Sequence, residues 1–419
     1  MPRRMKDSGL QWVGKIPAEW EVAPLYSTAR QVKKLNVGNR ERNLLSLSYG
    51  RIKRKDIDMA TGLVPASYAG YNIIESGDIV LRLTDLQNDK KSIRVGLSKE
   101  RGIVTSAYVT IRPDGKVSSD YLAYSILAFD IAKGFYGIGS GVRQGLTYDE
   151  VKKLKFQFPP LPEQEAIAAF LDSVTGKIDD LRGKLKREID RLEDYKKSAI
   201  TKAVCHGLNP KAKMKDSGIP WVGKVPEGWD ARRVGLTMVE RTARSASGKE
   251  EPLSMSQKLG IVPSKEIEVA NPASSYVGAK LVCVGDLVLN KLKAHLGVFA
   301  ISKYDGLVSP DYSVYRVNQT TSKEYLNYLF HTPSCISEFR RRITGVAVGF
   351  NRLYTSELFK VKIPFPALPE QREIAAHIDA MVGHVNAIVE KRKRQLDALD
   401  KLKRTVVYDY VTGKREVPR

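Results

Sequence analysis

Two short stretches of this sequence resemble residues that hold a methyl donor or a flipped base. GIGSG at 137–141 has the glycine spacing of a nucleotide or S-adenosylmethionine turn. Such a turn should follow a strand, open a helix and lead to an acidic residue, but VRQGLTYDEVKKL follows here. NPAS at 271–274 lacks the second proline and the aromatic residue that would stack on a flipped base. The chain is therefore not expected to transfer methyl groups itself.

Other catalytic arrangements are also missing from the sequence. There is no GxxxxGK[ST] phosphate loop, and the five histidines form neither an HExxH motif nor a Cys/His cluster. The three cysteines show no CxxC spacing, which fits a reducing compartment. No signal peptide and no apolar run of about 18 residues is recognisable. We therefore expect a soluble, cytoplasmic chain with no cofactor and no metal of its own.

The side chains that could do chemistry are cations placed beside amides and hydroxyls. The chain has 69 Lys and Arg against 47 Asp and Glu, and the formal net charge of +22 favours a polyanionic partner. DNA, RNA and an anionic membrane all fit, and an excess of this size favours nucleic acid. Lys and Arg can contact phosphates, whereas Arg, Asn, Gln and Ser can also bind base edges.

The candidate contacts lie in polar segments of both halves of the chain. In the first half they are Ser48, Tyr49, Arg51, Lys53, Arg54, Arg82, Thr84, Asn88, Lys90, Lys91, Arg143 and Gln144. In the second half they are Ser256, Gln257, Lys258, Asn290, Lys291, Lys293, Arg341, Arg342, Asn351 and Arg352. Any single one would be ordinary on a solvated surface. Their interpretation therefore depends on the elements that carry them.

These segments lie inside a duplicated framework. MKDSGLQWVGKIPAEW from Met5 returns as MKDSGIPWVGKVPEGW from Met214, and FPPLPEQ from Phe158 returns as FPALPEQ from Phe365. Between these anchors the two halves diverge, and short alternating runs bounded by Gly, Asp and Pro predict many short strands. Polar loops that differ between two equivalent halves indicate two different half-sites on a nucleic acid.

A long charged stretch follows each LPEQ motif. Apolar residues recur every three or four positions, which predicts two long helices that pair along their length, with Arg392 interrupting the second stripe. Leu-Pro-Glu-Gln is typical of a helix start, and Gly207 and Gly413 are typical of helix ends. The residues expected in this helix pair or at a partner dock are Leu171, Ile178, Leu181, Leu185, Leu192, Ile378, Val385, Leu396, Leu399 and Leu402.

Together these features predict a mixed α/β chain of the α+β class with a pseudo-twofold internal repeat. Two globular recognition domains would be separated by two long antiparallel helices, each roughly 60 Å long at about 1.5 Å per residue. The predicted divisions are a first domain at 1–160, a spacer helix at 161–207, a second domain at 208–367 and a second spacer helix at 368–419.

The duplicated WVGKIPAEW and WVGKVPEGW segments, the duplicated FP(P/A)LPEQ helix starts and the divergent segments between them occur in one combination. This chain thereby resembles, over essentially its whole length, the specificity subunits of type I restriction-modification systems. The resemblance implies two target recognition domains that read a split, asymmetric site on double-stranded DNA, and helices that dock two methyltransferase subunits. S-adenosylmethionine would then belong to the methyltransferase partner, and ATP and Mg to the restriction partner. The chain itself would be a non-catalytic specificity subunit.

Two other functions remain open at this point. One is a stand-alone adenine-N6 DNA methyltransferase, which would bind S-adenosylmethionine as an isolated chain. The other is a non-specific nucleic-acid-binding scaffold, which would bind scrambled duplexes as well as any other. The sequence does not give the half-sites, because base preference depends on loop geometry.

Overall fold

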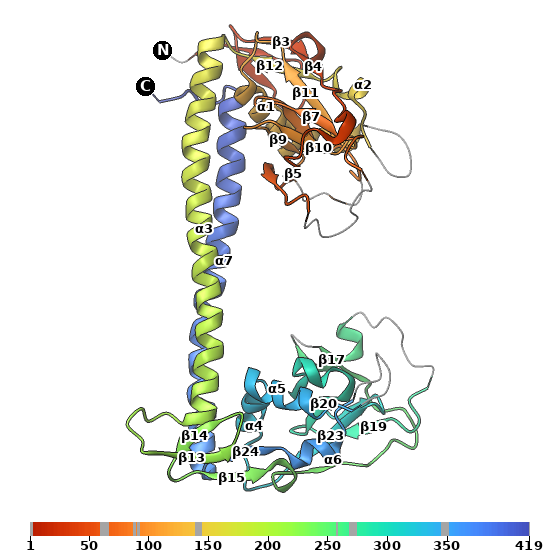
Figure 1. Ribbon diagram of the computed structural model, residues 1–419, viewed down its shortest axis with the longest axis vertical. Helices are drawn as coiled ribbons and strands as arrows, with labels where there is room; N and C mark the ends of the chain where they lie inside the picture. Colours follow the sequence, from red (N-terminus) through yellow and green to blue (C-terminus); the bar gives the residue numbers. More distant parts are fainter. Residues whose placement is uncertain are drawn as a thin grey trace. The chain divides into compact units, whose positions relative to one another are not determined.

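The structure is a computed structural model that describes residues 3–58, 67–86, 89, 93–138, 145–256, 259–267, 275–344 and 352–418. The chain divides into two compact units (Figure 1). The first unit contains Met1–Leu185 and Lys393–Arg419, and the second contains Lys186–Arg392. Each unit therefore holds one part of each of the two long helices, α3 (Leu161–His206) and α7 (Leu368–Val411).

The first unit is built on a four-stranded antiparallel sheet with the order β4-β11-β8-β9. Two-stranded ladders β1-β2, β3-β12, β5-β6 and β7-β10 surround this sheet. The elements are β1 (Met5–Asp7), β2 (Lys15–Pro17), β3 (Glu21–Pro24), β4 (Ala29–Gln31), β5 (Leu45–Ser48), β6 (Arg51–Arg54), β7 (Asn72–Ile74), β8 (Ile79–Leu81), β9 (Val95–Leu97), β10 (Gly102–Val104), β11 (Val109–Pro113), α1 (Ser119–Ile131), α2 (Tyr148–Val151) and β12 (Lys155–Phe158), with 3-10 turns at Leu25–Ser27, Val37–Asn39 and Gly134–Gly137.

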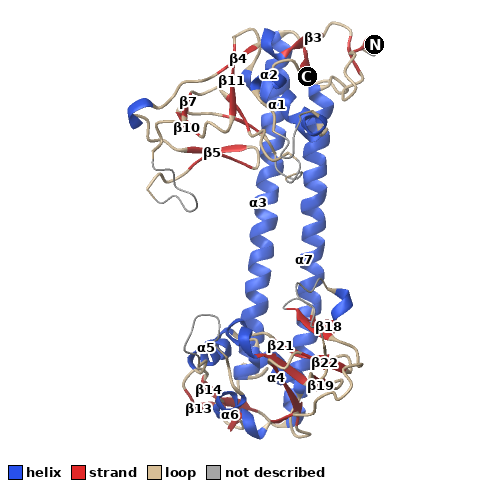
Figure 2. Ribbon diagram, turned by 90° about the vertical axis from the view of Figure 1, so that its right-hand side faces the viewer, coloured by secondary structure: helices blue, strands red, loops and turns tan. Residues whose placement is uncertain are grey.

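The second unit repeats this plan with a sheet of order β16-β23-β20-β21, and in both units loops join the short strands (Figure 2). Its elements are β13 (Met214–Ile219), β14 (Gly223–Pro226), β15 (Asp230–Arg233), β16 (Met238–Glu240), β17 (Leu253–Ser256), β18 (Gly260–Pro263), β19 (Lys280–Val282), β20 (Leu287–Asn290), η6 (Lys291–Leu296), β21 (Phe299–Ile301), β22 (Gly306–Val308), β23 (Tyr312–Val317), α4 (Lys323–Phe330), α5 (Pro333–Arg341), α6 (Thr355–Lys360) and β24 (Lys362–Phe365), with 3-10 turns at Val234–Leu236 and Ser264–Glu266. The mixed α+β class and the internal repeat are therefore confirmed.

The repeated glutamate of LPEQ joins each helix start to a buried tryptophan. The indole N–H of Trp20 donates to Glu163 Oε2 at 3.1 Å, and that of Trp229 donates to Glu370 Oε1 at 2.9 Å. The first unit adds Arg3, whose guanidinium donates to both oxygens of Glu163 at 2.6 and 2.8 Å. These bonds raise the pKa of Arg3 although its burial opposes the shift. The glutamate therefore fixes the helix start in addition to favouring its positive end.

The repeated glutamine of LPEQ explains the rest of the motif. Gln164 is buried, donates through Nε2 to the Pro159 carbonyl at 2.8 Å and accepts through Oε1 from the Ser118 amide at 2.9 Å. Ser118 is the N-cap of α1, so Gln164 joins two helix starts. Gln371 makes the two equivalent bonds in the second unit, each at 2.8 Å.

In each unit a buried tyrosine contacts the end of the long helix that begins in the other repeat. The buried hydroxyl of Tyr121 donates to the Gln157 carbonyl at 3.0 Å and to the Val411 carbonyl, near the end of α7, at 3.3 Å. In the second unit the hydroxyl of Tyr325 donates to the Val204 carbonyl, near the end of α3, at 2.8 Å. The two long helices therefore pack antiparallel, as the repeat predicts.

Most of the apolar positions expected in the helix pair are buried or half-buried. Leu171, Ile178, Ile378 and Val385 are buried, and Leu185, Leu192, Leu396 and Leu399 are half-buried. Leu181 and Leu402 are 48% and 49% exposed, so neither is buried in the helix pair, and their place at a partner dock stays a prediction. The physical reason is that two paired helices bury only a narrow stripe, and these two residues lie at its edge.

Ion pairs line the edges of this seam in both units. In the first unit Lys403 Nζ lies 2.8 Å from Asp179, and Arg182 Nε lies 2.7 Å from Asp400. In the second unit Arg392, which interrupts the apolar stripe, lies 2.8 Å from Glu188.

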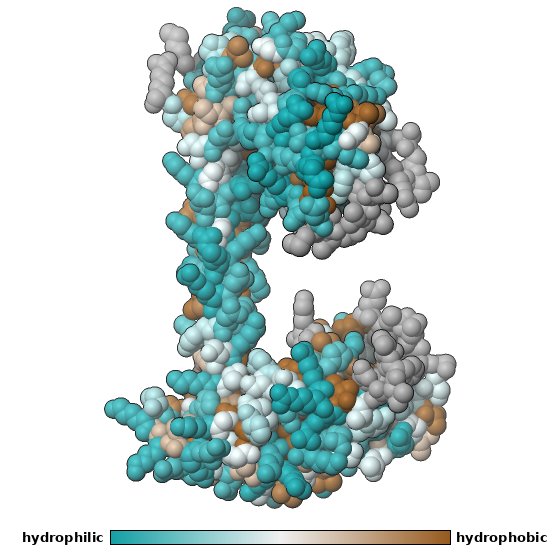
Figure 3. Space-filling view, in the orientation of Figure 1, coloured by the Kyte–Doolittle hydropathy of each residue, from teal (hydrophilic) through white to brown (hydrophobic). Residues whose placement is uncertain are grey.

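Among the described helices none is long and apolar enough to cross a membrane. The visible faces of α3 and α7 are mainly hydrophilic (Figure 3).

Candidate nucleic-acid interface

The β5-β6 hairpin carries the first group of predicted contacts. Its two turn residues, Tyr49 and Gly50, both have positive φ values, 48° and 76°, as a tight two-residue hairpin turn requires. Tyr49 is 83% exposed at this tip, and Ser48 beside it is half-buried. The three cations that follow, Arg51, Lys53 and Arg54, are exposed along β6. The hairpin therefore presents an aromatic ring and a row of cations to solvent.

The structure brings this hairpin next to the loop between β8 and β9, which carries Arg82 and Thr84. A Cβ placed on Gly50 would lie 2.8 Å from Ile93 Cγ2, so the hairpin tip touches the end of that loop. A Cβ on Gly96 of β9 would likewise meet Ile52 of β6 at 3.1 Å. Two segments that are about thirty positions apart in the sequence thus form one surface.

Several of the predicted cations already have partners. Arg51 pairs with Asp179 of α3, and Arg54 Nε donates to Glu100 Oε2 at 2.7 Å. Arg82 Nη2 lies 3.8 Å from Asp89. A phosphate would have to replace these carboxylates. Lys53 is exposed and pairs with no carboxylate in the part of the chain that the structure describes, so it would not carry that cost.

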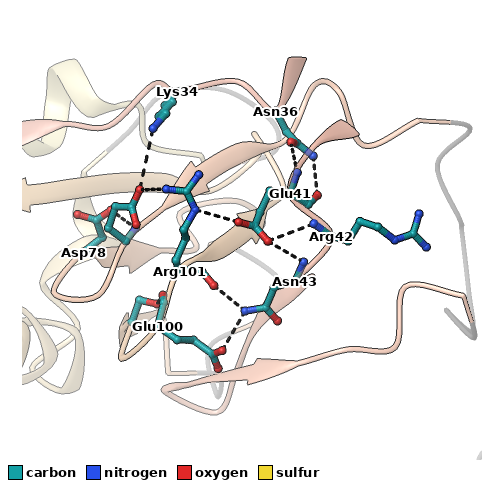
Figure 4. A network of polar contacts seen from close by, with 10 residues as sticks. Lys34, Asn36, Glu41, Arg42, Asn43, Asp78, Glu100 and Arg101 are labelled. Carbon is teal, nitrogen blue, oxygen red and sulfur yellow. Dashed lines mark hydrogen bonds and ion pairs between the residues drawn. The ribbon is translucent and has the colours of Figure 1, made fainter. Parts of the chain in front are cut away.

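A polar network next to the hairpin balances the charge further (Figure 4). Arg101 donates to Glu41 at 2.9 Å and to Glu75 at 2.8 Å, while Asn43 donates to Glu100 at 2.9 Å. The backbone N–H of Asn43 and the Arg101 guanidinium hold the pKa of Glu41 below its usual range. This edge of the first unit is therefore not uniformly cationic.

The loop after β8 is fixed from inside the unit. Leu83 and Leu86 are fully buried, whereas Thr84 between them is exposed. Asp85 has a φ of 58°, a left-handed conformation that is uncommon for a residue other than glycine. Sequence reasoning missed Arg94, which is fully buried and binds this loop through its guanidinium. In the sequence, only its position directly before the apolar residues of strand β9 distinguishes Arg94 from the neighbouring surface cations.

The second unit assembles an equivalent surface from β17-β18 and the segment after β20. A Cβ on Gly260 would lie 3.5 Å from Ala300 of β21, so this hairpin also lies against the sheet, with Ser256 half-buried in it. Asn290 is only 6% exposed, and its Oδ1 accepts from the amides of Leu292 and Lys293 at 3.1 and 3.3 Å. The structure gives Asn290 a capping contact, and its base contact stays a prediction.

Lys291 and Arg352 come together beside this cap. The Leu353 amide donates to the Lys291 carbonyl at 3.3 Å, and Arg352 Nη2 lies 3.0 Å from Asp311. Burial, followed by the charge of Lys280, holds the pKa of Lys291 below its usual value. The carboxylates of Asp311 and Glu240 act in the opposite direction but do not cancel the shift. Lys293 lies exposed on the same turn.

Helix α5 also packs on this turn, because Arg340 Nε donates to the His295 carbonyl at 2.9 Å. Arg341 at the end of α5 is exposed. Arg342 is half-buried and donates to Glu338 at 2.8 Å. Arg341 and Arg342 thus lie at the end of a helix that contacts the turn after β20. Arg342 is already paired with the Glu338 carboxylate.

Eight predicted contacts lie outside the described residues. They are Asn88, Lys90, Lys91, Arg143, Gln144, Gln257, Lys258 and Asn351. The NPAS segment and most of GIGSG also lie outside them. Within the described part of the chain, no group of His, Cys, Asp and Glu could hold a metal ion.

The family of type I restriction modification DNA specificity domains matches this chain at residues 63–191 and 263–398. The type I restriction enzyme MjaVIII specificity subunit of Methanocaldococcus jannaschii is 23% identical over 372 residues, which cover 82% of this chain and 80% of that protein. Among solved structures, one described as the structural basis of complex assembly and conformational transition of the type I R-M system matches with a TM-score of 0.70 and 17% identity, covering 96% of this chain and 99% of that one. The HsdS subunit of Thermoanaerobacter tengcongensis matches with a TM-score of 0.52 and 17% identity, covering 96% of this chain and 98% of the other.

The matched segments together cover more than half of the chain and fall in both repeats. The chain therefore belongs to the family of type I restriction modification DNA specificity domains, and it contains that domain twice. It is the specificity subunit of a type I restriction-modification complex, which agrees with the expectation that it is itself non-catalytic.

Proposed function

We propose that each unit of this specificity subunit reads one half of a split, asymmetric site on double-stranded DNA. The observation that carries this proposal is a polar hairpin placed against the central sheet in both units, β5-β6 next to the loop after β8 and β17-β18 against β21, the strand that follows the polar segment after β20. The two surfaces occupy equivalent positions but carry different side chains. Equivalent positions with different residues are what two different half-sites require.

The long helices serve as the dock for two methyltransferase subunits, and the restriction subunits join the complex through them. Leu181 and Leu402 support this role, because the helix pair leaves both half-exposed in its own structure. S-adenosylmethionine is bound by the methyltransferase partner, and ATP and Mg are bound by the restriction partner. The assembled complex acts on DNA in the cytoplasm.

A segment exchange tests the reading function. Residues 22–157 would be replaced by the equivalent segment of a relative, and the chimera would be assembled with the methyltransferase partner. We expect one half of the methylated site to change and the other half to stay. A reciprocal exchange of residues 231–364 is the matched control and should change the other half. Methylome sequencing that shows both halves altered by either exchange would contradict independent reading by the two units.

A pair of substitutions tests the docking function separately. Leu181→Glu combined with Leu402→Glu should lower co-purification of the methyltransferase subunit, because each change places a charge on an exposed apolar position. Thermal stability of the isolated chain should change little, since surface substitutions usually cost less than about 0.5 kcal/mol. Unchanged co-purification would remove these positions from the dock.

A further inference from the structure

Arg94 is a fully buried arginine between the loop after β8 and strand β9. All of its described guanidinium partners are neutral oxygens, and four of them are backbone carbonyls of one short segment. Its N–H groups donate to Tyr136 Oη at 3.2 Å, to the carbonyls of Arg82 at 3.1 Å, Thr84 at 2.8 Å and Asp85 at 3.2 Å, and to the carbonyl of Asp89.

These bonds determine the path of residues 82–86. Leu83 and Leu86 point into the core, the backbone around them turns its carbonyls onto the guanidinium, and Thr84 is left exposed. Asp85 is held in a left-handed conformation, which costs free energy and persists only where surrounding contacts impose it. The planar fork of arginine, with five fixed donors, is suited to gathering several acceptors at once.

The second unit shows that the fold does not require an arginine here. The Arg82 amide donates to the Arg94 carbonyl at 2.9 Å, and the Asn290 amide donates to the Val298 carbonyl at 3.1 Å, so Val298 is the equivalent of Arg94. A buried valine fills that position, and the Asn290 side chain caps the turn from the opposite end. The five hydrogen bonds of the guanidinium offset the cost of burying its charge, and four of them hold the backbone of the segment after β8.

We infer that Arg94 is a positioning residue for reading the first half-site, because it sets where Arg82 and Thr84 meet the base edges. Asn290 has the same role in the second unit through a different bond. This inference rests on the proposed reading function. It adds that one polar side chain, Arg94 in the first unit and Asn290 in the second, fixes the shape of the reading loop from its protein side.

The test uses the full chain assembled with its methyltransferase partner. Arg94→Met removes every donor at similar length, and Arg94→Lys keeps the charge but loses the planar fork. The readout is methylation of duplex libraries in which each half-site is randomised in turn. We expect discrimination at the first half-site to fall by on the order of tenfold, with the second half-site unchanged. Arg94→Lys should lose less of this discrimination. If the Arg94→Met chain does not assemble with its partner, the Arg94→Lys result tests the inference.

Two controls separate positioning from general destabilisation. Arg112 forms a bidentate ion pair with Asp78 on the same sheet, at 2.6 and 2.8 Å, without contacting the loop. Arg112→Met should lower the melting temperature and keep the first half-site. Asn290→Ala should relax the second half-site alone.

Three outcomes distinguish the claims. Intact first-half discrimination in both Arg94 variants would overturn the inference. Equal relaxation by Arg112→Met would also overturn it, because loss of stability would then suffice. A wild-type complex that methylates no bipartite site would instead contradict the proposed function itself.

Discussion

Gly413, just after the end of α7, offers a sharp test of how the first unit holds this helix. Its φ is 69°, and a Cβ on it would lie 2.7 Å from Pro17 Cγ, closer still to Pro17 Cδ, and 3.1 Å from the Trp20 ring. Gly207, at the equivalent end of α3, has a φ of 76°, but a Cβ there would come no closer than 3.3 Å to the Trp229 ring. The two glycines share a backbone conformation and differ in available space.

The expected costs follow from this difference. Alanine in the left-handed region costs about 1–2 kcal/mol at either position. Overlap with a packed neighbour adds about 1–3 kcal/mol at Gly413 alone, because the proline ring cannot move away as a flexible side chain would. For a unit of roughly 200 residues, each kcal/mol shifts the melting temperature by about 2–4 °C. Gly413→Ala should therefore melt roughly 2–12 °C below Gly207→Ala.

Differential scanning calorimetry of the full chain measures both variants. Pro17→Ala removes the two ring atoms that a new Cβ would meet, so the cost of Gly413→Ala should fall to that of Gly207→Ala in this background. Pro226→Ala provides the matched change beside Gly207, where the nearest proline atom is 3.5 Å from the Cβ position and little relief is expected. Equal losses at the two glycines, or no rescue by Pro17→Ala, would refute the argument.

Three further predictions concern single side chains of the first unit. Tyr121→Phe should cost about 1–3 kcal/mol because the buried Gln157 carbonyl loses its side-chain donor, whereas the Val411 carbonyl keeps a hydrogen bond from Gln157 Nε2 at 2.8 Å. Tyr124→Phe, whose hydroxyl reaches an exposed carboxylate, should cost less in the same denaturant titration. Lys53→Ala should weaken binding to cognate and scrambled duplexes alike and lower the salt slope by about 0.9, whereas Arg54→Ala should lower it less because Arg54 is already paired with a carboxylate. Burial raises the pKa of Asp179, but hydrogen bonds from Lys403 and Arg51 outweigh it and hold the value below the ordinary one. Asp179 therefore stabilises the fold above about pH 4, and the stability gap between wild type and Asp179→Asn should close as the pH falls below that value.

The framework was readable from the sequence because it depends on local patterns. The apolar stripe and the LPEQ motif predicted α3 and α7. Gly207 lies one position and Gly413 two positions after a helix end, and both have positive φ. Alternating runs gave strands such as β11 and β23. What the stripe could not show is which of its leucines lie at the seam. Leu181 follows the period yet is half-exposed, because period alone does not fix the width of a helix contact.

The surface for DNA was less readable, for two physical reasons. Arg94 looks like one more surface cation, since arginine is seldom fully buried and its acceptors are backbone carbonyls that carry no residue identity. Arg51 and Arg54 look like free cations, but their partners Asp179 and Glu100 are far away in the sequence. Ion pairs between residues far apart in the sequence produce no periodic pattern in it. The sequence therefore indicated the segments that could bind DNA better than the residues within them.

The central sheet of each unit explains how the β5-β6 and β17-β18 hairpins can differ while the framework stays the same. Successive side chains of a strand point to opposite faces, so Ile79 and Leu81 of β8 join the core with α1 and the helix ends, while Val80 joins the cluster of the β5-β6 hairpin. In β20, Leu287 and Leu289 pack with the helices, and Val288 packs with the hairpin β17-β18. A change in the hairpin is therefore felt on one face of the sheet, while the contacts that hold α3 and α7 lie on the other. This separation lets the two repeats carry different polar hairpins on the same framework, whereas the loop after β8 packs on the helix side through Leu83 and Leu86.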